Sequence, residues 1–253
     1  MTSHAIGDTA VLTGRSLRHI LRSPDTIVTT AVTPIALMLL FTYVFGGAID
    51  VGGASYIDYM LPGILLITIA SGIAYTAYRL FLDMQGGIFE RFQSMPIARA
   101  SVLWAHVLTS LVAILVSIAV VIGVALLMGF RTGASFGVWL AVIGIMVLFT
   151  LALTWVAVIA GLSAKTVDGA SAFSYPLIFL PFISSAFVPT DSMPAPVAWF
   201  AENQPVTSIV DTMRALFSGQ PVGADIWVAL AWLVGILIVA YAVAVSIYRR
   251  KVR

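Results

Sequence analysis

VLWAHVLTSLVAILVSIAVVIGVALLM, residues 102–128, contains no aspartate, glutamate, lysine or arginine. An α-helix needs about 20 apolar residues to cross the hydrocarbon core of a bilayer, and this run is longer than that. The rest of the chain has a similar composition, with 60% hydrophobic and 9% charged residues, whereas a typical soluble domain has about 25% charged residues. Lipid is therefore the expected solvent of most of this protein.

Further apolar runs lie on both sides of this stretch. Together they predict six helical spans, at about 26–45, 60–80, 102–128, 137–162, 170–188 and 226–248. The predicted fold is all-α and polytopic, with residues 1–253 forming one membrane domain. Pro176 and Pro181 interrupt the fifth span. A proline removes a helical hydrogen bond, and the freed backbone groups at membrane depth must then be satisfied by protein or water.

The lysines and arginines predict the orientation of these spans. With six spans, only Arg131 and Arg214 of the 13 lysines and arginines fall on one side of the membrane. Cytoplasmic loops carry the excess of positive charge, so both termini are expected in the cytoplasm. A cleaved signal peptide is the competing interpretation of the N-terminus, but its apolar core has about 7–15 residues, fewer than the first run here.

The segment before the first span is amphipathic. At about 100° per residue, Arg15, Arg18 and Arg22 fall on one narrow face, with leucine and isoleucine side chains roughly opposite. This pattern predicts a helix that lies in the cytoplasmic membrane interface. A solvated helix beside the membrane would have the same pattern, and both interpretations stay open.

A second charged segment lies between the second and third spans. In GGIFERFQSMPIARAS, residues 86–101, the side chains of Ile88, Phe89, Phe92 and Met95 occupy one arc of a helix, and Pro96 ends it. The sequence therefore predicts a short amphipathic helix on the cytoplasmic side. It either rests on lipid or fits a groove of a partner protein, where aromatic anchors contribute much of the binding energy.

Several kinds of chemistry are not expected. Neither lysine follows a glycine, so the chain has no P-loop and should not hydrolyse ATP by itself. Cysteine is absent and the three histidines are far apart, so no metal site is expected. His106 is interpreted as a helix-end residue or as a functional one, because ionisable groups within spans are often functional. The acidic residues lie at span ends or in loops, which disfavours proton-coupled transport.

Four parts of the sequence resemble a known family in their order and spacing. The first is the amphipathic segment before the first span, and the second is YMLPG, residues 59–63. The third is DMQGGIFERF, residues 83–92, followed by SMP at 94–96. The fourth is the segment with FVP at 187–189, MP at 193–194, NQPVT at 203–207 and DTMR at 211–214. Over nearly its whole length the chain resembles the permease subunits of type-2 ABC exporters, which include the daunorubicin-resistance membrane subunits. Ile88 and the inserted Gln204 depart from the family pattern.

The resemblance implies partners and a location. A separate cytoplasmic ABC ATPase would bind ATP and Mg²⁺, and a second permease copy, identical or different, would complete the pathway. The membrane would be the cytoplasmic (inner) membrane of a bacterium, and a nucleic-acid partner is not expected. The predicted coupling helix would contact the ATPase through Gly87, Phe89, Glu90, Arg91, Phe92 and Met95. Glu90 is the first candidate contact, and the helix with Arg15, Arg18 and Arg22 would lie beside it.

The segment between the last two spans is implied to form a re-entrant hairpin at an outer gate. Its candidate residues are Pro189, Asn203, Pro205, Asp211 and Arg214. The alternative is that Asp211 and Arg214 only form a local pair at positions i and i+3, worth a few tenths of a kcal/mol.

The function implied by the resemblance is ATP-driven export of an amphipathic drug or lipid. Seven aromatic side chains are candidates to line the pathway, although aromatic residues in membrane helices more often pack against protein or face lipid: Phe41, Tyr43, Phe45, Tyr75, Phe173, Phe179 and Phe182. The alternatives are a glycan or polymer exporter of the same family, a secondary transporter that needs no ATPase, and a membrane scaffold that transports nothing.

Overall fold

The computed structural model describes residues 24–49, 51, 55–86 and 99–251, and every regular element within these ranges is helical. Four helices are long and apolar enough to cross a membrane. They are α3 (Tyr56–Gln85), α5 (Arg99–Leu127), α6 (Phe136–Ser163) and α11 (Asp225–Lys251). They agree to within a few residues with the predicted second, third, fourth and sixth spans.

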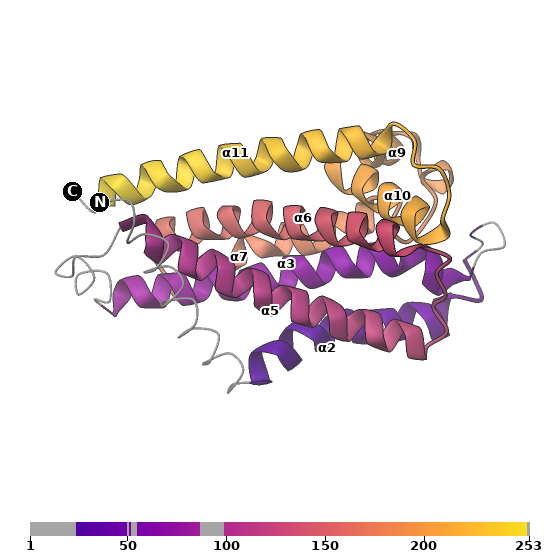
Figure 1. Cartoon of the computed structure of the whole chain (residues 1–253), viewed down its shortest axis with the longest axis horizontal. Helices are drawn as coiled ribbons and strands as arrows, with labels where there is room; N and C mark the ends of the chain where they lie inside the picture. The colour runs from indigo at the N-terminus through magenta and orange to yellow at the C-terminus, as the bar shows by residue number, and fades with distance from the viewer. Residues whose placement is uncertain (1–23, 50, 52–54, 87–98, 252–253) are drawn as a thin grey trace.

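The predicted first span corresponds to a shorter apolar segment. Helix α2 (Pro24–Leu40) continues into a π-helical turn, η1 (Phe41–Phe45). Figure 1 shows that α2 begins part-way along the bundle instead of at its end. The apolar part of this helix, Thr30–Phe45, is shorter than the four long helices.

The predicted fifth span is divided into three short helices, α7 (Val167–Ala172), α8 (Ser174–Phe179) and the 3₁₀ turn η2 (Leu180–Ile183). Serine side chains bond to carbonyl groups near the breaks. Ser174 Oγ donates to the carbonyl of Ser171 at 2.7 Å, and Ser184 Oγ donates to the carbonyl of Pro181 at 2.6 Å. These hydroxyl groups give backbone carbonyls near the breaks a hydrogen-bond donor, which lipid could not provide. Because the first and fifth segments are short, six membrane crossings stay a prediction.

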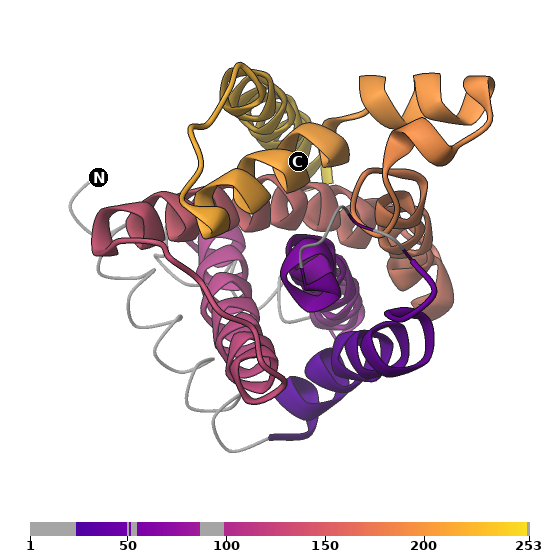
Figure 2. The same ribbon diagram turned by 90° about the vertical axis from the view of Figure 1, so that its right-hand side faces the viewer.

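Helix α3 lies at the centre of the bundle. Viewed from the end in Figure 2, it is surrounded by α2, α5, α6 and the α7–α8 segment. Within its most apolar window 83% of the residues are buried, against 28% for α5 and 22% for α11. Helix α11 instead lies along the outside of α6. Trp155 of α6 is the main aromatic contact there, with ring centroids 4.8 Å from Tyr241 and 5.2 Å from Trp104.

Small residues permit close packing of other elements against α3. A Cβ atom added at Gly161 of α6 would lie 2.8 Å from the carbonyl oxygen of Ala77, and one added at Gly63 would lie 2.6 Å from Cβ of Ala186. Both distances are shorter than a normal contact, so only glycine allows these backbones to approach so closely. Close approach at small residues is a common way for helices to associate in membranes.

The segment between η2 and α11 covers one end of the bundle, the predicted outer end. It contains the 3₁₀ turn η3 (Thr190–Ser192), α9 (Ala195–Asn203) and α10 (Pro205–Ser218). Helix α10 runs across the ends of α6, α3 and α11 (Figures 1 and 2). Five apolar side chains that recur at helical spacing in α10 are all buried: Val206, Ile209, Val210, Met213 and Leu216. Gly219 ends α10 in the left-handed conformation, with a φ of 66°.

Candidate functional site

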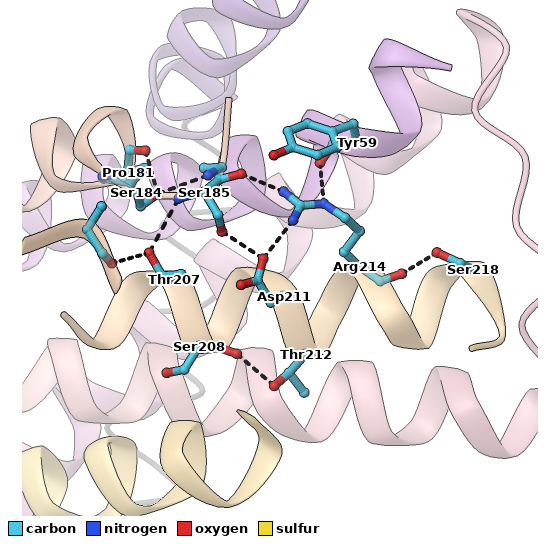
Figure 3. Close-up of polar contacts among 12 residues, drawn as sticks. Tyr59, Pro181, Ser184, Ser185, Thr207, Ser208, Asp211, Thr212, Arg214 and Ser218 are labelled. Atoms are coloured by element: carbon cyan, nitrogen blue, oxygen red, sulfur yellow. Dashed lines mark hydrogen bonds and ion pairs between the residues drawn. The ribbon is translucent and has the colours of Figure 1, made fainter. Parts of the chain in front are cut away.

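Arg214 contacts three separate parts of the chain at the predicted outer end (Figure 3). From α10, its Nε donates to the carbonyl of Tyr59 at 3.2 Å, and its Nη2 donates to the carbonyl of Ser185 at 2.7 Å. Its Nη1 forms an ion pair with Asp211 Oδ1 at 2.6 Å. The guanidinium carbon also lies 3.8 Å from the centroid of the Tyr59 ring. We call Tyr59, Ser185, Asp211 and Arg214 the Arg214 cluster.

Ser185 joins the cluster through both its side chain and its backbone. Ser185 Oγ donates to Asp211 Oδ1 at 2.7 Å, so the carboxylate accepts hydrogen bonds from two directions. The backbone N–H of Ser185 donates to Thr207 Oγ1 at 3.3 Å. Thr207 in turn donates to the carbonyl of Ala201 at 2.5 Å, which connects α9 to the same network.

Gln204 is a further polar contact between α10 and the broken fifth segment. Its Oε1 accepts from the N–H of Val206 at 3.2 Å and thereby caps α10. Its Nε2 donates to the carbonyl of Ile183 at 3.0 Å. The residue that departs from the family pattern therefore binds the end of η2 to the start of α10.

The Arg214 cluster is partly buried, with 21% of the Arg214 side chain and 34% of the Asp211 side chain exposed. An ion pair in this position is screened less than one on an open surface. The local pair between Asp211 and Arg214 is present, and the same arginine makes additional contacts to α3 and to the loop after η2. The role of these residues in an outer gate stays a prediction.

The other predicted gate residues shape the chain around the cluster and are not part of it. The carbonyl of Pro189 accepts from Ser192 Oγ at 2.7 Å in η3. Asn203 Nδ2 donates to the carbonyl of Trp199 at 2.7 Å near the end of α9. Pro205 is the first residue of α10, a position where the missing N–H of proline costs no helical bond.

Four of the seven predicted pathway residues lie together in an aromatic cluster, and a fifth ring, Phe187, joins them. The ring centroids of Phe41 and Phe187 are 4.8 Å apart, and those of Phe182 and Phe187 are 4.9 Å apart. Phe45 contacts Phe41 at 5.4 Å, and Phe179 contacts Phe182 at 6.2 Å. The aromatic cluster connects the π-helical turn η1 to the broken fifth segment. Phe187 was not predicted as a pathway residue.

One side of this region is exposed in the single chain. Phe45 and Phe179 of the aromatic cluster and the neighbouring Tyr43 and Tyr175 are all exposed, with values of 70% for Tyr43 and 61% for Phe179. The remaining predicted pathway residues lie elsewhere. Tyr75 contacts Tyr78 and Arg79 on α3, and Phe173 is partly buried against the main core.

The predicted cytoplasmic site lies mostly outside the described residues. This holds for the coupling residues Gly87, Phe89, Glu90, Arg91, Phe92 and Met95 and for Arg15, Arg18 and Arg22. Next to residues 87–98, the structure shows a contact that was not predicted. His106 Nε2 lies 3.2 Å from Asp83 Oδ2, which joins α5 to α3.

Comparisons with known proteins show which family this sequence resembles along most of its length. A family profile described as ABC-2 type transporter matches residues 8–218. The chain is 26% identical over 254 residues to the daunorubicin resistance ABC transporter permease protein DrrB1 of Streptomyces coeruleorubidus, with 98% of this chain and 88% of the relative covered. It is 29% identical over 250 residues to the probable doxorubicin resistance ABC transporter permease protein DrrC of Mycobacterium tuberculosis, covering 97% of this chain and 89% of the relative.

Proposed function

Because the chain belongs to the ABC-2 type transporter family, we propose that it is the membrane-spanning permease subunit of an ATP-driven exporter. Its substrate would be an amphipathic drug or lipid, taken from the cytoplasm or the inner leaflet. The observation that carries this proposal is the similarity, over nearly the whole chain, to permeases named for resistance to daunorubicin or doxorubicin. The four long apolar helices support a membrane location.

ATP and Mg²⁺ would bind to a separate cytoplasmic ATPase, because this chain has no P-loop. We assign the contact with that ATPase to residues 87–95, with Glu90 as the foremost charged contact and Phe89 and Phe92 as apolar anchors. Closure of the ATPases on ATP would move this segment and open the pathway outward. Both chain termini would lie on the same, cytoplasmic side of a bacterial inner membrane.

The pathway would run between two permease copies along the aromatic cluster of Phe41, Phe45, Phe179, Phe182 and Phe187. Two observations support this position. Aromatic side chains are exposed there in the single chain, and the backbone of the fifth segment is broken beside them. Irregular backbone at membrane depth is tolerated only when protein or a water-filled cavity covers it, which a second copy would provide.

The Arg214 cluster would close the outer end of this pathway. It binds α10 and the loop after η2, at Ser185, to the first turn of α3 at Tyr59. Gly63 and Ala186 bring the same loop into close contact with α3. An outward-open state would have to separate these groups or move them together with α3.

Purification of the tagged chain from its native host tests the partnership. After crosslinking and extraction in mild detergent, mass spectrometry should identify a soluble P-loop ATPase in stoichiometric amount. A second, different permease would show that the pathway is formed by a heterodimer. If the chain is recovered alone, ATP-driven export is wrong and secondary transport or scaffolding becomes the better interpretation.

Replacement of Glu90 tests the coupling contact. Glu90→Ala should lower daunorubicin export at least about tenfold, because loss of one partner of an interfacial charge pair costs about 2–5 kcal/mol. Accumulation of the drug in cells, measured at equal amounts of membrane-inserted protein, provides the readout. Gln93→Ala, a neutral polar change in the same segment, serves as the matched control. Unchanged export by Glu90→Ala would contradict the assignment of Glu90.

A further inference from the structure

The contact between Asp83 and His106 lies where α3 and α5 meet residues 87–98. Helix α3 ends at Gln85 and α5 begins at Arg99, so both helices connect directly to that segment. His106 Nε2 and Asp83 Oδ2 are 3.2 Å apart, and the two side chains are 20% and 31% exposed. The nitrogen and the oxygen are close enough for an electrostatic contact between the two side chains.

The pair belongs to a series of contacts between the two antiparallel helices. Farther from residues 87–98, Thr76 Oγ1 donates to Ser110 Oγ at 2.8 Å. Beyond that, Gly72 lies against Ile114 so closely that an added Cβ would be 2.6 Å from the isoleucine side chain. The contacts between α3 and α5 thus change from charged, to neutral polar, to apolar along the bundle.

Among the described residues, the other side chains around the pair do not replace it. Arg79 lies one turn before Asp83 on α3, but its guanidinium carbon is 5.7 Å from the centroid of the Tyr75 ring. The nearby buried side chains Leu80, Leu103 and Val107 are apolar. Apolar contacts are not directional, whereas the contact between His106 and Asp83 depends on the position of one nitrogen and one oxygen atom. The pair therefore fixes the position of α3 along α5 near this end.

Helix α3 carries a charged contact near each end. Two ion pairs connect residues that the structure describes, Asp83–His106 and Asp211–Arg214. The first joins the last turns of α3 to α5. The second belongs to the Arg214 cluster, which bonds to Tyr59 in the first turn of α3. The 30 residues between these ends span about 45 Å as an α-helix.

We propose that Asp83 and His106 are positioning residues that make α3 and α5 move as one unit with residues 87–98, so that α3 carries this motion to the Arg214 cluster. The proposal rests on the proposed function, in which an ATPase moves residues 87–98. Beyond that function, it states that Asp83 and His106 transmit the motion and that α3 carries it. Without the pair, residues 87–98 would move while α3 kept its position.

The test compares Asp83→Ala, His106→Ala, these two changes combined, and the exchanged double variant, Asp83→His with His106→Asp. Each is reconstituted with its ATPase in vesicles, and daunorubicin export per ATP hydrolysed is measured. Each single variant should lower this ratio about tenfold, because it leaves one partly buried ionisable side chain without its partner. The exchanged variant should recover most of it. Ser110→Ala, which removes the neutral contact one step farther along, should keep the native ratio.

A second measurement separates the possible failures. Thermal unfolding of the native permease, Asp83→Ala, His106→Ala and their combination, each alone in detergent, forms a double-mutant cycle that reports the Asp83–His106 contact without any ATPase. Lower stability with an unchanged export ratio would overturn the proposal, because the pair would then be only structural. If native vesicles show no ATP-dependent export while the cycle shows coupling, the proposed function fails and transmission fails with it. If neither measurement responds to the single variants, the contact itself is wrong.

Discussion

The side chain of Arg214 connects α10 with α3 and with the loop after η2. Its acceptors are the carbonyl of Tyr59, the carbonyl of Ser185 and the carboxylate of Asp211, which lie in three different parts of the chain. The planar guanidinium presents five N–H donors in fixed directions and also stacks on aromatic rings. A lysine ammonium has neither property, so equal charge does not give equal function here.

Arg214→Lys should therefore destabilise the protein although it keeps the charge. We expect the free energy of unfolding to fall by about 2 kcal/mol, the range for hydrogen bonds to a charged group. Thermal unfolding in detergent measures the change. The control is Arg131→Lys, because among the described residues the Arg131 side chain donates to the carbonyls of Leu126 and Phe130, both in its own part of the chain. Equal unfolding temperatures for the two variants would contradict a connecting role for Arg214.

Sequence spacing could predict only the local part of this cluster. Asp211 and Arg214 are three residues apart, and a helix brings such positions together. Tyr59 and Ser185 lie 155 and 29 residues before Arg214, so their proximity depends on the packing of α10 across α3. The same reason applies to Asp83 and His106, which only the antiparallel arrangement of α3 and α5 brings together.

At the scale of the element, the fifth segment shows what proline does at membrane depth. Pro176 and Pro181 correctly predicted an interruption. The particular division into α7, α8 and η2 depends on serine hydroxyls that bond to nearby carbonyls and on the contacts of Gln204 and Thr207 with the loop after η2. Apolar length predicted the four long helices well, because length and composition alone decide whether a helix suits a bilayer.

Gly161 and Gly144 give a matched pair for testing the packing of α6. Gly161→Ala would place a Cβ 2.8 Å from the carbonyl oxygen of Ala77, in backbone that cannot rotate away. We expect a loss of about 1–3 kcal/mol of unfolding free energy, as for other overpacked sites. Gly144→Ala meets nothing within 4 Å and should be neutral or slightly stabilising, because alanine favours helix more than glycine.

Thermal unfolding of both variants decides between close and loose packing of α6 on α3. The expected result is a clear drop in unfolding temperature for Gly161→Ala only. If Gly161→Ala is as stable as Gly144→Ala, α6 does not lie as close to α3 as the structure shows.

At the scale of the whole molecule, the absence of cysteine allows a direct test of topology. Ser192 and Asp168 are exposed and lie on opposite sides of the fifth segment. In intact cells, a membrane-impermeant maleimide should label Ser192→Cys and leave Asp168→Cys unlabelled. Both should react after the membrane is permeabilised, which provides the control for access.

This experiment decides whether the fifth segment crosses the membrane. The excess of lysine and arginine on one side predicts that only Ser192→Cys is labelled in intact cells. This labelling pattern requires the short fifth segment to cross the membrane. Labelling of both cysteines from outside would show that the fifth segment returns to the side from which it enters. The six-span prediction would then be wrong, although the four long helices would still cross.

The position of α3 also has a consequence for how the protein is made. Of the four long helices it is the least apolar and the most buried. Its surface therefore suits contact with other helices better than contact with lipid. During synthesis α3 leaves the ribosome before α5, α6, α7 and α8, the neighbours that cover most of it. A nascent chain that stops before α6 would leave the surface of α3 uncovered. Because translation proceeds from the N-terminus, α3 becomes covered only after α5, α6, α7 and α8 have been synthesised.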